Sequence, residues 1–492
     1  MSVQSIDFAA IAPPLVVALT ALLVLVLDLL LPDARRAVTV AVATAVGLLV
    51  ALGAVAALTV DGAQRQTFCV ASDECSYAVD DLTLLFQLVI LAGALIVVLI
   101  AATGVPTMRV PRGEHDFLLL CSVSGALVLA ASRDLVGFIV ALEVVTLPTF
   151  ALVGLRRYDP RSSEAALKIF LVSVTATAVS LFGISLVYGA TGEMFFVALA
   201  EAPRSDGALD TVAALGVVLT LAALAFKVSA VPFHFWAPDT YEGAPLPVAA
   251  YLSVVSKAAG FVGIVLLVGR AFPAYDDVWG PVLAVLAAVT MTLGNLVALR
   301  QRVAIRLLAW SSIAQAGYML VPIAVVPTAT DPAAALAATI VYVVVYAAMN
   351  LGAFAVVSVV NRAGDRNLLS DYRGLARTNP VAALALAFFL ACLAGLPPGL
   401  VGLFAKVVVF DAAIDASANW LALIMAINTV IGLAYYLAWA ASLFRSGDER
   451  PAAGVPWSTG AAIGVTAAIT VVLSVAPGLV LNLLADPGAL LR

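Results

Sequence analysis

Lysine is scarce in this chain of 492 residues, since four of its 25 basic residues are lysine and the other 21 are arginine. Charged residues of all kinds make up 11% of the chain, whereas they make up about 25% of a typical soluble domain. Hydrophobic residues account for 63%. This composition excludes an ordinary soluble globular domain. No basic cluster is present that would indicate a nucleic-acid partner.

Signatures of cofactor and metal chemistry are also missing. The sequence has no Walker A motif, no glycine-rich dinucleotide fingerprint after a strand, and no cluster with metal-ligand spacing. These absences predict that the chain itself holds no metal, nucleotide, flavin or iron–sulfur cluster and has no catalytic residue set of its own.

Cysteine is rare as well, with four residues in the chain. Cys121 and Cys392 lie inside apolar runs and are expected to be packing residues. Cys69 and Cys75 share a short polar loop, where their spacing permits a disulfide if the loop faces an oxidising compartment. Two free thiols are the alternative.

Long apolar runs recur from end to end, and each is long enough to cross a hydrocarbon core of about 30 Å. The runs are continuous rather than alternating, which predicts helices. We therefore expect an all-α polytopic membrane protein of about 14 transmembrane helices. The predicted spans are 11–31, 38–60, 79–103, 114–131, 134–154, 164–190, 209–232, 246–270, 278–299, 303–325, 333–361, 380–413, 420–445 and 457–484.

The loops between these runs alternate in charge. One set carries 16 arginines and the other carries five, so the positive-inside rule places the first set in the cytoplasm. Both termini and the Cys69/Cys75 loop are then expected outside. The whole chain, 1–492, is expected to form a single membrane domain.

Proline and glycine interrupt two of the predicted spans, in the sequences FKVSAVPFHFWAPDTYEGAPLP and LAGLPPGLVGLFAKVV. These residues remove or weaken helix hydrogen bonds, and the freed backbone must face protein or a hydrated cavity. Paired interruptions suggest inverted repeats. We expect two five-helix repeats at 114–270 and 278–445, preceded by three helices in 1–110 and followed by a C-terminal helix in 457–492.

All four lysines, Lys168, Lys227, Lys257 and Lys406, lie within apolar helical segments. A lysine near the bilayer centre costs about 2.5–3.5 kcal/mol on insertion scales, and lysine can release its proton where arginine cannot. This placement predicts proton handling. Lys257 could instead reach the membrane edge, and Lys168, one turn after Glu164, could be an interfacial or salt-bridged residue.

Glu143 lies well inside the span 134–154, and Lys227 is its candidate cationic partner. Pairing keeps both groups ionised, and weakening the pair favours release of the lysine proton. The alternative is a fixed ion pair that specifies helix packing.

Further polar residues are candidates for a relay or for lining a hydrated axis. His234 could relay protons or could be a structural histidine at the break. Tyr346 and Asn350 could line water or could serve as interhelical hydrogen-bonding residues. His115 is expected to be a solvated surface residue.

Five segments carry a resemblance to a known family: ASRDLVGFIVALEVVTLPTFALVGLRR, SSEAALKIFLVSV, AFKVSAVPFHFWAPDTYEGAPLPVAAYLSVVSKAAGF, RLLAWSSIAQAGYML and GLPPGLVGLFAKVVVF. They are similar to the antiporter-like subunits of respiratory complex I, the NADH–quinone oxidoreductase. Among these subunits, the chain most resembles subunit N in three features: the lysine at 406, the short C-terminus and the YYL run ending at Leu437. The resemblance covers roughly the third predicted span to the last.

The resemblance implies roles for individual residues. Glu143 and Lys227 match the pair that tunes the proton site, Lys257 matches the central proton-carrying lysine, and Lys406 matches the lysine that leads to the exit path or the neighbouring subunit. Lys168 matches a lysine of secondary importance. Gln315 is a departure, since the family usually has a histidine there. Glutamine does not titrate but can hold a water, so any proton relay assigned to this position is in doubt.

The function implied is proton translocation coupled to quinone reduction. NADH, FMN, iron–sulfur clusters and quinone are then expected in partner subunits. The expected neighbours are an M-like antiporter subunit on one side and K/J-like subunits on the other. A subunit of a multisubunit cation/proton antiporter or membrane-bound hydrogenase is the main alternative. A stand-alone secondary transporter and a purely structural scaffold are more distant ones.

Overall fold

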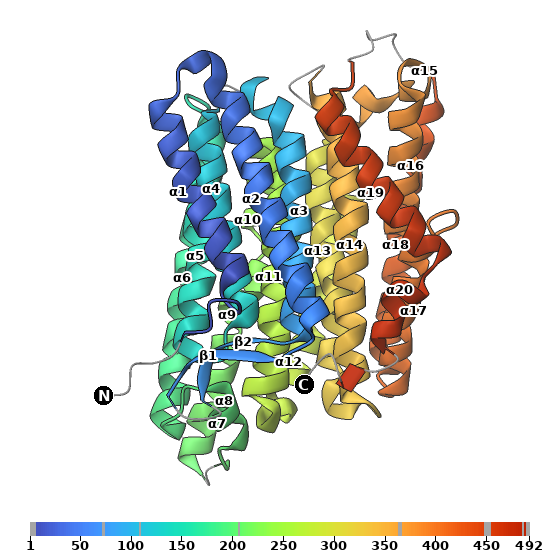
Figure 1. Cartoon of the computed structure of the whole chain (residues 1–492). Helices are drawn as coiled ribbons and strands as arrows, with labels where there is room; N and C mark the ends of the chain where they lie inside the picture. The colour runs from blue at the N-terminus through green and yellow to red at the C-terminus, as the bar shows by residue number, and fades with distance from the viewer. Residues whose placement is uncertain are drawn as a thin grey trace.

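The computed structural model describes residues 6–70, 74–107, 110–204, 207–362, 367–446, 454–484 and 487–488. Its helices run mostly along one common axis, and a small β-hairpin lies across one end of the bundle (Figure 1). Within the described residues, 13 helices are long and apolar enough to cross a membrane. The predicted span 380–413 is split into two shorter helices, which explains the difference from the expected count of about 14.

The helices alternate with short connections along the whole chain. In the first half they are α1 (Ala12–Leu30), α2 (Asp33–Asp61), α3 (Asp81–Thr107), α4 (Arg112–Ala131), α5 (Leu135–Val153), α6 (Pro160–Thr191), α7 (Phe196–Glu201), α8 (Ala208–Thr220), α9 (Ala222–Lys227), α10 (Trp236–Gly243), α11 (Leu246–Leu266), η1 (Leu267–Ala271) and η2 (Pro273–Tyr275). In the second half they are α12 (Asp276–Ala298), α13 (Ala304–Ala324), η3 (Val326–Thr328), α14 (Pro332–Asn361), η4 (Leu369–Tyr372), α15 (Leu375–Thr378), α16 (Pro380–Ala394), α17 (Leu400–Asp415), α18 (Asn419–Phe444), α19 (Trp457–Val475), α20 (Gly478–Leu481) and η5 (Asn482–Leu484).

Both predicted interruptions are present. The first separates α9 from α10 at residues 228–235, and the second separates α16 from α17 at residues 395–399. Gly395 ends α16 with a φ of 79°, a conformation that glycine adopts without the penalty paid by other residues. Lysines therefore lie beside both breaks, with Lys227 at the end of α9 and Lys406 within α17.

The centre of the bundle is formed by α11, α13 and α14. In the apolar stretches of these helices, 94%, 89% and 83% of the residues are buried. The outer helices α1, α2 and α6 are each 33% buried, as expected for helices that face lipid on one side. Most polar side chains on the three central helices are consequently enclosed by protein.

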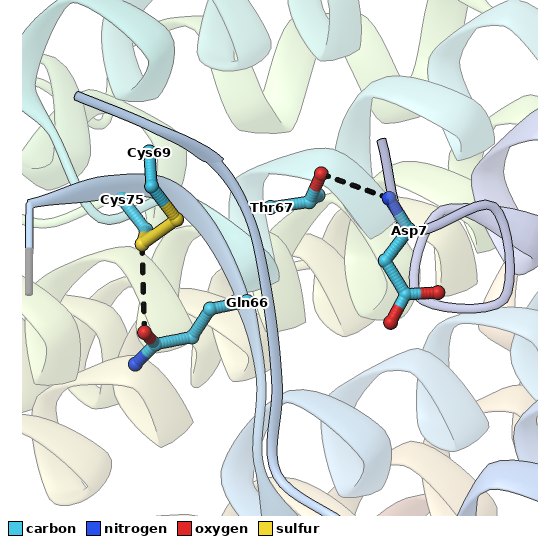
Figure 2. The surroundings of a disulfide bond; sticks show 5 residues. All are labelled: Asp7, Gln66, Thr67, Cys69 and Cys75. Carbon is cyan, nitrogen blue, oxygen red and sulfur yellow. Dashed lines mark hydrogen bonds between the residues drawn. A yellow bond between two sulfur atoms is a disulfide. The ribbon is translucent and has the colours of Figure 1, made fainter. Parts of the chain in front are cut away.

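The hairpin was not predicted from the sequence. Strands β1 (Arg65–Cys69) and β2 (Cys75–Val79) pair antiparallel, and a disulfide joins Cys69 to Cys75 across the pair. Figure 2 shows this disulfide and, beside it, the backbone N–H of Asp7 in the N-terminal segment, which donates to the Thr67 hydroxyl at 3.2 Å. The N-terminal segment is thereby held against the hairpin.

One expectation about a histidine is wrong. His115 is fully buried within the first turn of α4, and its Nδ1 lies 2.8 Å from Asp116. Arg112 Nε donates to the same carboxylate at 2.8 Å. The residue is buried because the first turn of α4 lies within a helix that packs against α1, α2 and α3.

Candidate functional site

Lys227 lies at the first break, with 3% of its surface exposed. Its ammonium donates to the Thr146 hydroxyl on α5 at 2.8 Å. Glu143, one turn earlier on α5, instead accepts a hydrogen bond of 2.6 Å from Thr177 on α6. The direct ion pair expected from the sequence does not form, since no salt bridge within 4.0 Å joins these two described residues. Glu143 remains close enough to act electrostatically on Lys227.

Lys227 reaches this position because α11 carries a glycine beneath it. A Cβ atom at Gly260 would lie 3.2 Å from both Cβ and Cγ of Lys227 and 2.8 Å from Val228. The lysine stem therefore crosses α11 at Gly260. Lys257 lies three residues earlier on the same helix, so one helix contacts the first lysine and carries the second.

Lys257 is 2% exposed and does not reach the membrane edge. Its ammonium donates to the Ser312 backbone carbonyl at 2.7 Å and to the Ser312 hydroxyl at 2.6 Å, both on α13. Tyr346 on α14 donates to the same hydroxyl at 2.9 Å. The lysine and the Tyr346 phenol thus meet at Ser312.

Asn350 lies one turn after Tyr346 on α14 and is completely buried. It donates to the Ser253 hydroxyl on α11 at 3.0 Å, while its own Oδ1 has no hydrogen-bond partner. A buried amide oxygen without a partner is a site for an ordered water.

Gln315 follows Ser312 by three residues on α13, on the side toward the second break. It donates to the Leu393 carbonyl at 3.1 Å and to the Tyr436 hydroxyl at 3.2 Å, and it accepts from Tyr342 at 2.6 Å. The glutamine therefore connects α13 with α14, α16 and α18 without itself titrating.

Lys406 is 5% exposed. Its ammonium donates to the Ala394 carbonyl at 2.8 Å, at the C-terminal end of α16, and lies 5.4 Å from the centre of the Tyr318 ring. A Cβ atom at Gly395 would approach Lys406 Cδ to 2.9 Å. Glycine at the break thus leaves room for the lysine, and the lysine satisfies a carbonyl that the helix end leaves free.

These groups follow one another along α13. Ser312, Gln315 and Tyr318 are spaced three residues apart, so they lie on one side of the helix. They contact Lys257, the Leu393 carbonyl and Lys406 respectively. No direct hydrogen bond joins two of the buried lysines within the described residues. A proton moving between them needs intervening hydroxyls or waters.

Lys168 differs from the other three lysines. Its side chain is 42% exposed, and its ammonium lies 2.7 Å from both Glu164 and Asp239. Arg306 on α13 pairs with Asp239 and Glu242 at 2.8 Å each. Burial raises the pKa of Asp239, but Lys168 and Arg306 outweigh that effect and hold the pKa below its ordinary value. We call these five residues the surface charge network.

His234 lies in the first break with 3% of its surface exposed. Its ring packs against Trp310 at 5.6 Å between centroids, and its Nδ1 has no hydrogen-bond partner. Burial lowers the pKa of His234 below its ordinary value. No hydrogen bond between His234 and Lys227 is present among the described residues.

Several residues that contact the lysines or Glu143 were not singled out from the sequence, namely Thr146, Thr177 and Ser312. A signal for one of them exists, since Thr146 follows Glu143 by one helical turn and so shares its face of α5. The other two lie on helices whose proximity only the fold reveals.

The described residues contain no group of three or more histidine, cysteine, aspartate or glutamate side chains that could hold a metal ion. The site is thus a row of three buried ammonium groups, each facing uncharged oxygens. We call it the lysine row (Lys227, Lys257 and Lys406).

Comparisons with known proteins place this geometry in context. The family model described as "NADH:quinone oxidoreductase/Mrp antiporter, TM" matches residues 132–432. A protein of Streptomyces griseus named "NADH-quinone oxidoreductase subunit N 2" is 55% identical over 480 residues, covering 94% of this chain and 87% of the relative. A chain of respiratory complex I from Thermus thermophilus is 33% identical with a TM-score of 0.78, covering 97% of this chain and 99% of that one.

A chain of the Mrp complex from Dietzia has a TM-score of 0.85 but is 22% identical, with 98% of this chain and 97% of that chain covered. At this sequence identity, the match shows that the two chains share a fold and shows nothing about function. The complex I relatives and the Mrp chain therefore differ mainly in their sequence identity to this chain, because the backbone arrangement of both solved structures is similar to that of this chain.

Proposed function

This chain belongs to the family of subunit N of NADH-quinone oxidoreductase, respiratory complex I, and from that membership we propose that its lysine row carries the protons. It is a multi-pass, proton-translocating membrane subunit of this oxidoreductase. The residue roles below are our proposal.

The observation that supports the proposal is the kind of partner each ammonium has. Lys227 faces a threonine hydroxyl, Lys257 a serine, and Lys406 a backbone carbonyl. A buried charge without an opposite charge is expensive. Each lysine can therefore give up its proton at less cost than a lysine held by a carboxylate.

Glu143 would act as the switch. Its carboxylate is held by Thr177 and stands apart from the Lys227 ammonium. If the carboxylate approaches Lys227, the protonated lysine is stabilised; if it withdraws toward Thr177, proton release is favoured. A charge change in a neighbouring subunit would shift this balance. The separation in the structure corresponds to the withdrawn arrangement.

Transfer from Lys257 to Lys406 would follow α13. Ser312 accepts from Lys257, and Gln315 bonds the Leu393 carbonyl, which is adjacent to the Ala394 carbonyl that Lys406 bonds. Gln315 cannot carry a proton, so Tyr342, Tyr436 and water would complete the path. His234 remains a candidate relay at the first break, and Tyr346 and Asn350 are candidates for holding water beside Lys257.

We propose that redox cofactors lie in partner subunits, where NADH, FMN, iron–sulfur clusters and quinone would be bound. An M-like antiporter subunit and K/J-like subunits would flank this chain in the bilayer. Both termini and the disulfide-linked hairpin would face the outer side, in agreement with the arginine distribution of the loops.

The proposed inverted repeats, 114–270 and 278–445, draw support from the two breaks. Each half contains one interrupted span with a lysine beside the interruption, Lys227 in the first and Lys406 in the second. Discontinuous helices in corresponding positions are the usual location of ion pathways in such folds.

A subunit of a cation/proton antiporter is the nearest rival. The fold does not separate the two, but the identities do: 55% to a subunit N and 22% to a chain of an Mrp complex. We therefore retain the complex I function.

The test uses the intact complex in membrane vesicles. Lys227→Ala and Glu143→Ala should both lower proton pumping and quinone reductase rate together, because coupling links the two. Unchanged rates for both variants, in complexes shown to be fully assembled, would show that the proposed switch is wrong.

A further inference from the structure

A polar cavity of about 110 Å³ lies beneath the β1–β2 hairpin, at the end of the bundle away from the surface charge network. Figure 1 shows the hairpin across this end, near α7 and α8. The cavity belongs to neither the lysine row nor the surface charge network. Its polar lining is formed by Gln64, Arg65, Gln66, Asp80, Arg133 and Arg270.

Two guanidinium groups share one carboxylate in its wall. Arg133 Nη2 lies 2.6 Å from Asp80 Oδ2, and Arg270 Nη2 lies 2.8 Å from the same oxygen. Burial raises the pKa of Asp80, and the two arginines outweigh it, so the pKa lies below its ordinary value. Asp80 is therefore ionised, and the trio carries one net positive charge.

Arg133 has unused hydrogen-bonding capacity. Its side chain is 7% exposed, and its Nη1 and Nη2 each donate to two protein oxygens, but its Nε has no hydrogen-bond partner. Buried donors of this kind nearly always bind protein, water or an ion. Arg65, in contrast, is occupied by Asp7 and Asp61 at 2.9 and 2.8 Å, so it adds little net charge.

The backbone holds the two arginines firmly. The Arg133 N–H donates to the Ser76 carbonyl of β2, and its own carbonyl accepts from Phe196 of α7, both at 2.9 Å. Arg270 lies in η1, a π-helical turn that ends α11. Turns of this type are frequent at functional sites.

We propose that this cavity binds a phosphate-type oxyanion between Arg133 and Arg270, either the headgroup phosphate of a lipid or a free phosphate ion. Guanidinium N–H groups form strong hydrogen bonds to phosphate oxygens, and the side chains of Gln64 and Gln66, which carry amide donors, also line the wall. The volume exceeds that of a single water, about 30 Å³.

An anion in this position would link the hairpin to the ends of two helices. Arg133 lies two residues before α5, which carries Glu143, and Arg270 lies in η1, directly after α11, which carries Lys257. The inference rests on the cavity alone and stands independently of the proposed proton path.

The test is hydrogen–deuterium exchange of the β1 and β2 amides in the purified complex, in neutral detergent and phosphate-free buffer. Inorganic phosphate and a short-chain phosphatidylglycerol are added separately. A bound ligand stabilises the closed site. When its concentration is about ten times its dissociation constant, amide exchange that requires the site to open should slow about tenfold. Slowing by phosphatidylglycerol alone identifies a lipid headgroup, and slowing by inorganic phosphate identifies a free oxyanion; either result supports the site.

Arg270→Gln should abolish the slowing, and Arg270→Lys should retain part of it. Arg204→Gln is the matched control, because Arg204 pairs with Asp210 and Asp277 and does not line the cavity. No slowing by either compound in the wild-type complex would overturn the proposal, and so would equal slowing in Arg270→Gln.

Discussion

The lysine row and the surface charge network place the same residue type in opposite surroundings. Lys168 is 42% exposed and is bound by two carboxylates. Lys257 is 2% exposed and is bound by the hydroxyl and carbonyl of one serine. A lysine neutralised by carboxylates keeps its proton, whereas a lysine that faces neutral oxygens is ready to exchange it. In the proposed path, the hydrogen-bond partner, more than the residue type, distinguishes Lys257 from Lys168.

The largest effect should come from Lys257→Met. Methionine preserves the length of the side chain but removes the titratable group at the centre of the lysine row. Loss of a positioned proton-transfer group typically costs about a hundredfold or more in rate. Proton pumping by vesicles containing the assembled complex should fall accordingly. Pumping near the wild-type rate would remove Lys257 from the path.

Glu143→Gln should have the next largest effect. The amide keeps the hydrogen bond from Thr177 but loses the charge that acts on Lys227. A lost coupling of about 1 kcal/mol corresponds to about a fivefold decrease in pumping. Glu143→Asp, which keeps the charge, should be milder. Equal effects of the two substitutions would show that the charge is not what matters.

Gln315→Leu should reduce both stability and pumping. Leucine leaves the Tyr342 hydroxyl and the Leu393 carbonyl without this partner, and each buried unpaired group costs about 1–3 kcal/mol. Gln315→His should restore pumping relative to leucine, because histidine can bond and also titrate. Thermal inactivation and pumping are measured together. Full activity of the leucine variant would mean that the path avoids Gln315.

Lys168→Met should have the smallest effect. Exposed ion pairs contribute about 0–1 kcal/mol, and Asp239 keeps its contact with Arg306. Pumping should remain close to wild type. A loss as large as that of Lys257→Met would erase the distinction between the two regions.

The pH dependence of proton pumping should also distinguish the surface charge network from the lysine row. The pKa of Asp239 is held below its ordinary value, so its stabilising contribution is fully present above the unfolded pKa and is lost only as pH falls through the lower folded pKa. The surface charge network thus stays intact from about pH 5 to about pH 8. Asp239→Asn should leave the shape of the pumping-versus-pH curve unchanged over this range. A displaced curve would implicate the network in proton transfer.

Much of the fold could be predicted because apolar runs and Pro/Gly interruptions act locally. The break at Gly395 followed from its neighbours in sequence, and the structure places it where expected. The hairpin could not be predicted in this way, since two five-residue strands in a polar loop give a weak signal beside long apolar helices. His115 was misjudged because the start of α4 packs against α1, α2 and α3, and only the fold reveals these contacts.

In the candidate site, too, local features could be predicted from the sequence and long-range contacts could not. Buried lysines are recognisable in sequence because their cost in a bilayer is high. Their partners are not, because threonine and serine in helices commonly bond their own backbone and give no sign of a distant contact. Ser312 illustrates this: nothing in its neighbourhood predicts that Lys257, 55 residues away, donates to it. The separation of Glu143 from Lys227 likewise depends on Thr177 of a third helix.

The central claim is that neutral surroundings make the lysine row functional, and Ser312→Asp tests it most directly. This substitution gives Lys257 the kind of partner that Lys168 has, while Ser312→Asn is the uncharged control of equal size. Proton pumping is measured on assembled complexes in vesicles. We predict that the aspartate variant loses pumping as severely as Lys257→Met and that the asparagine variant retains a substantial part. Wild-type pumping in Ser312→Asp would contradict the claim.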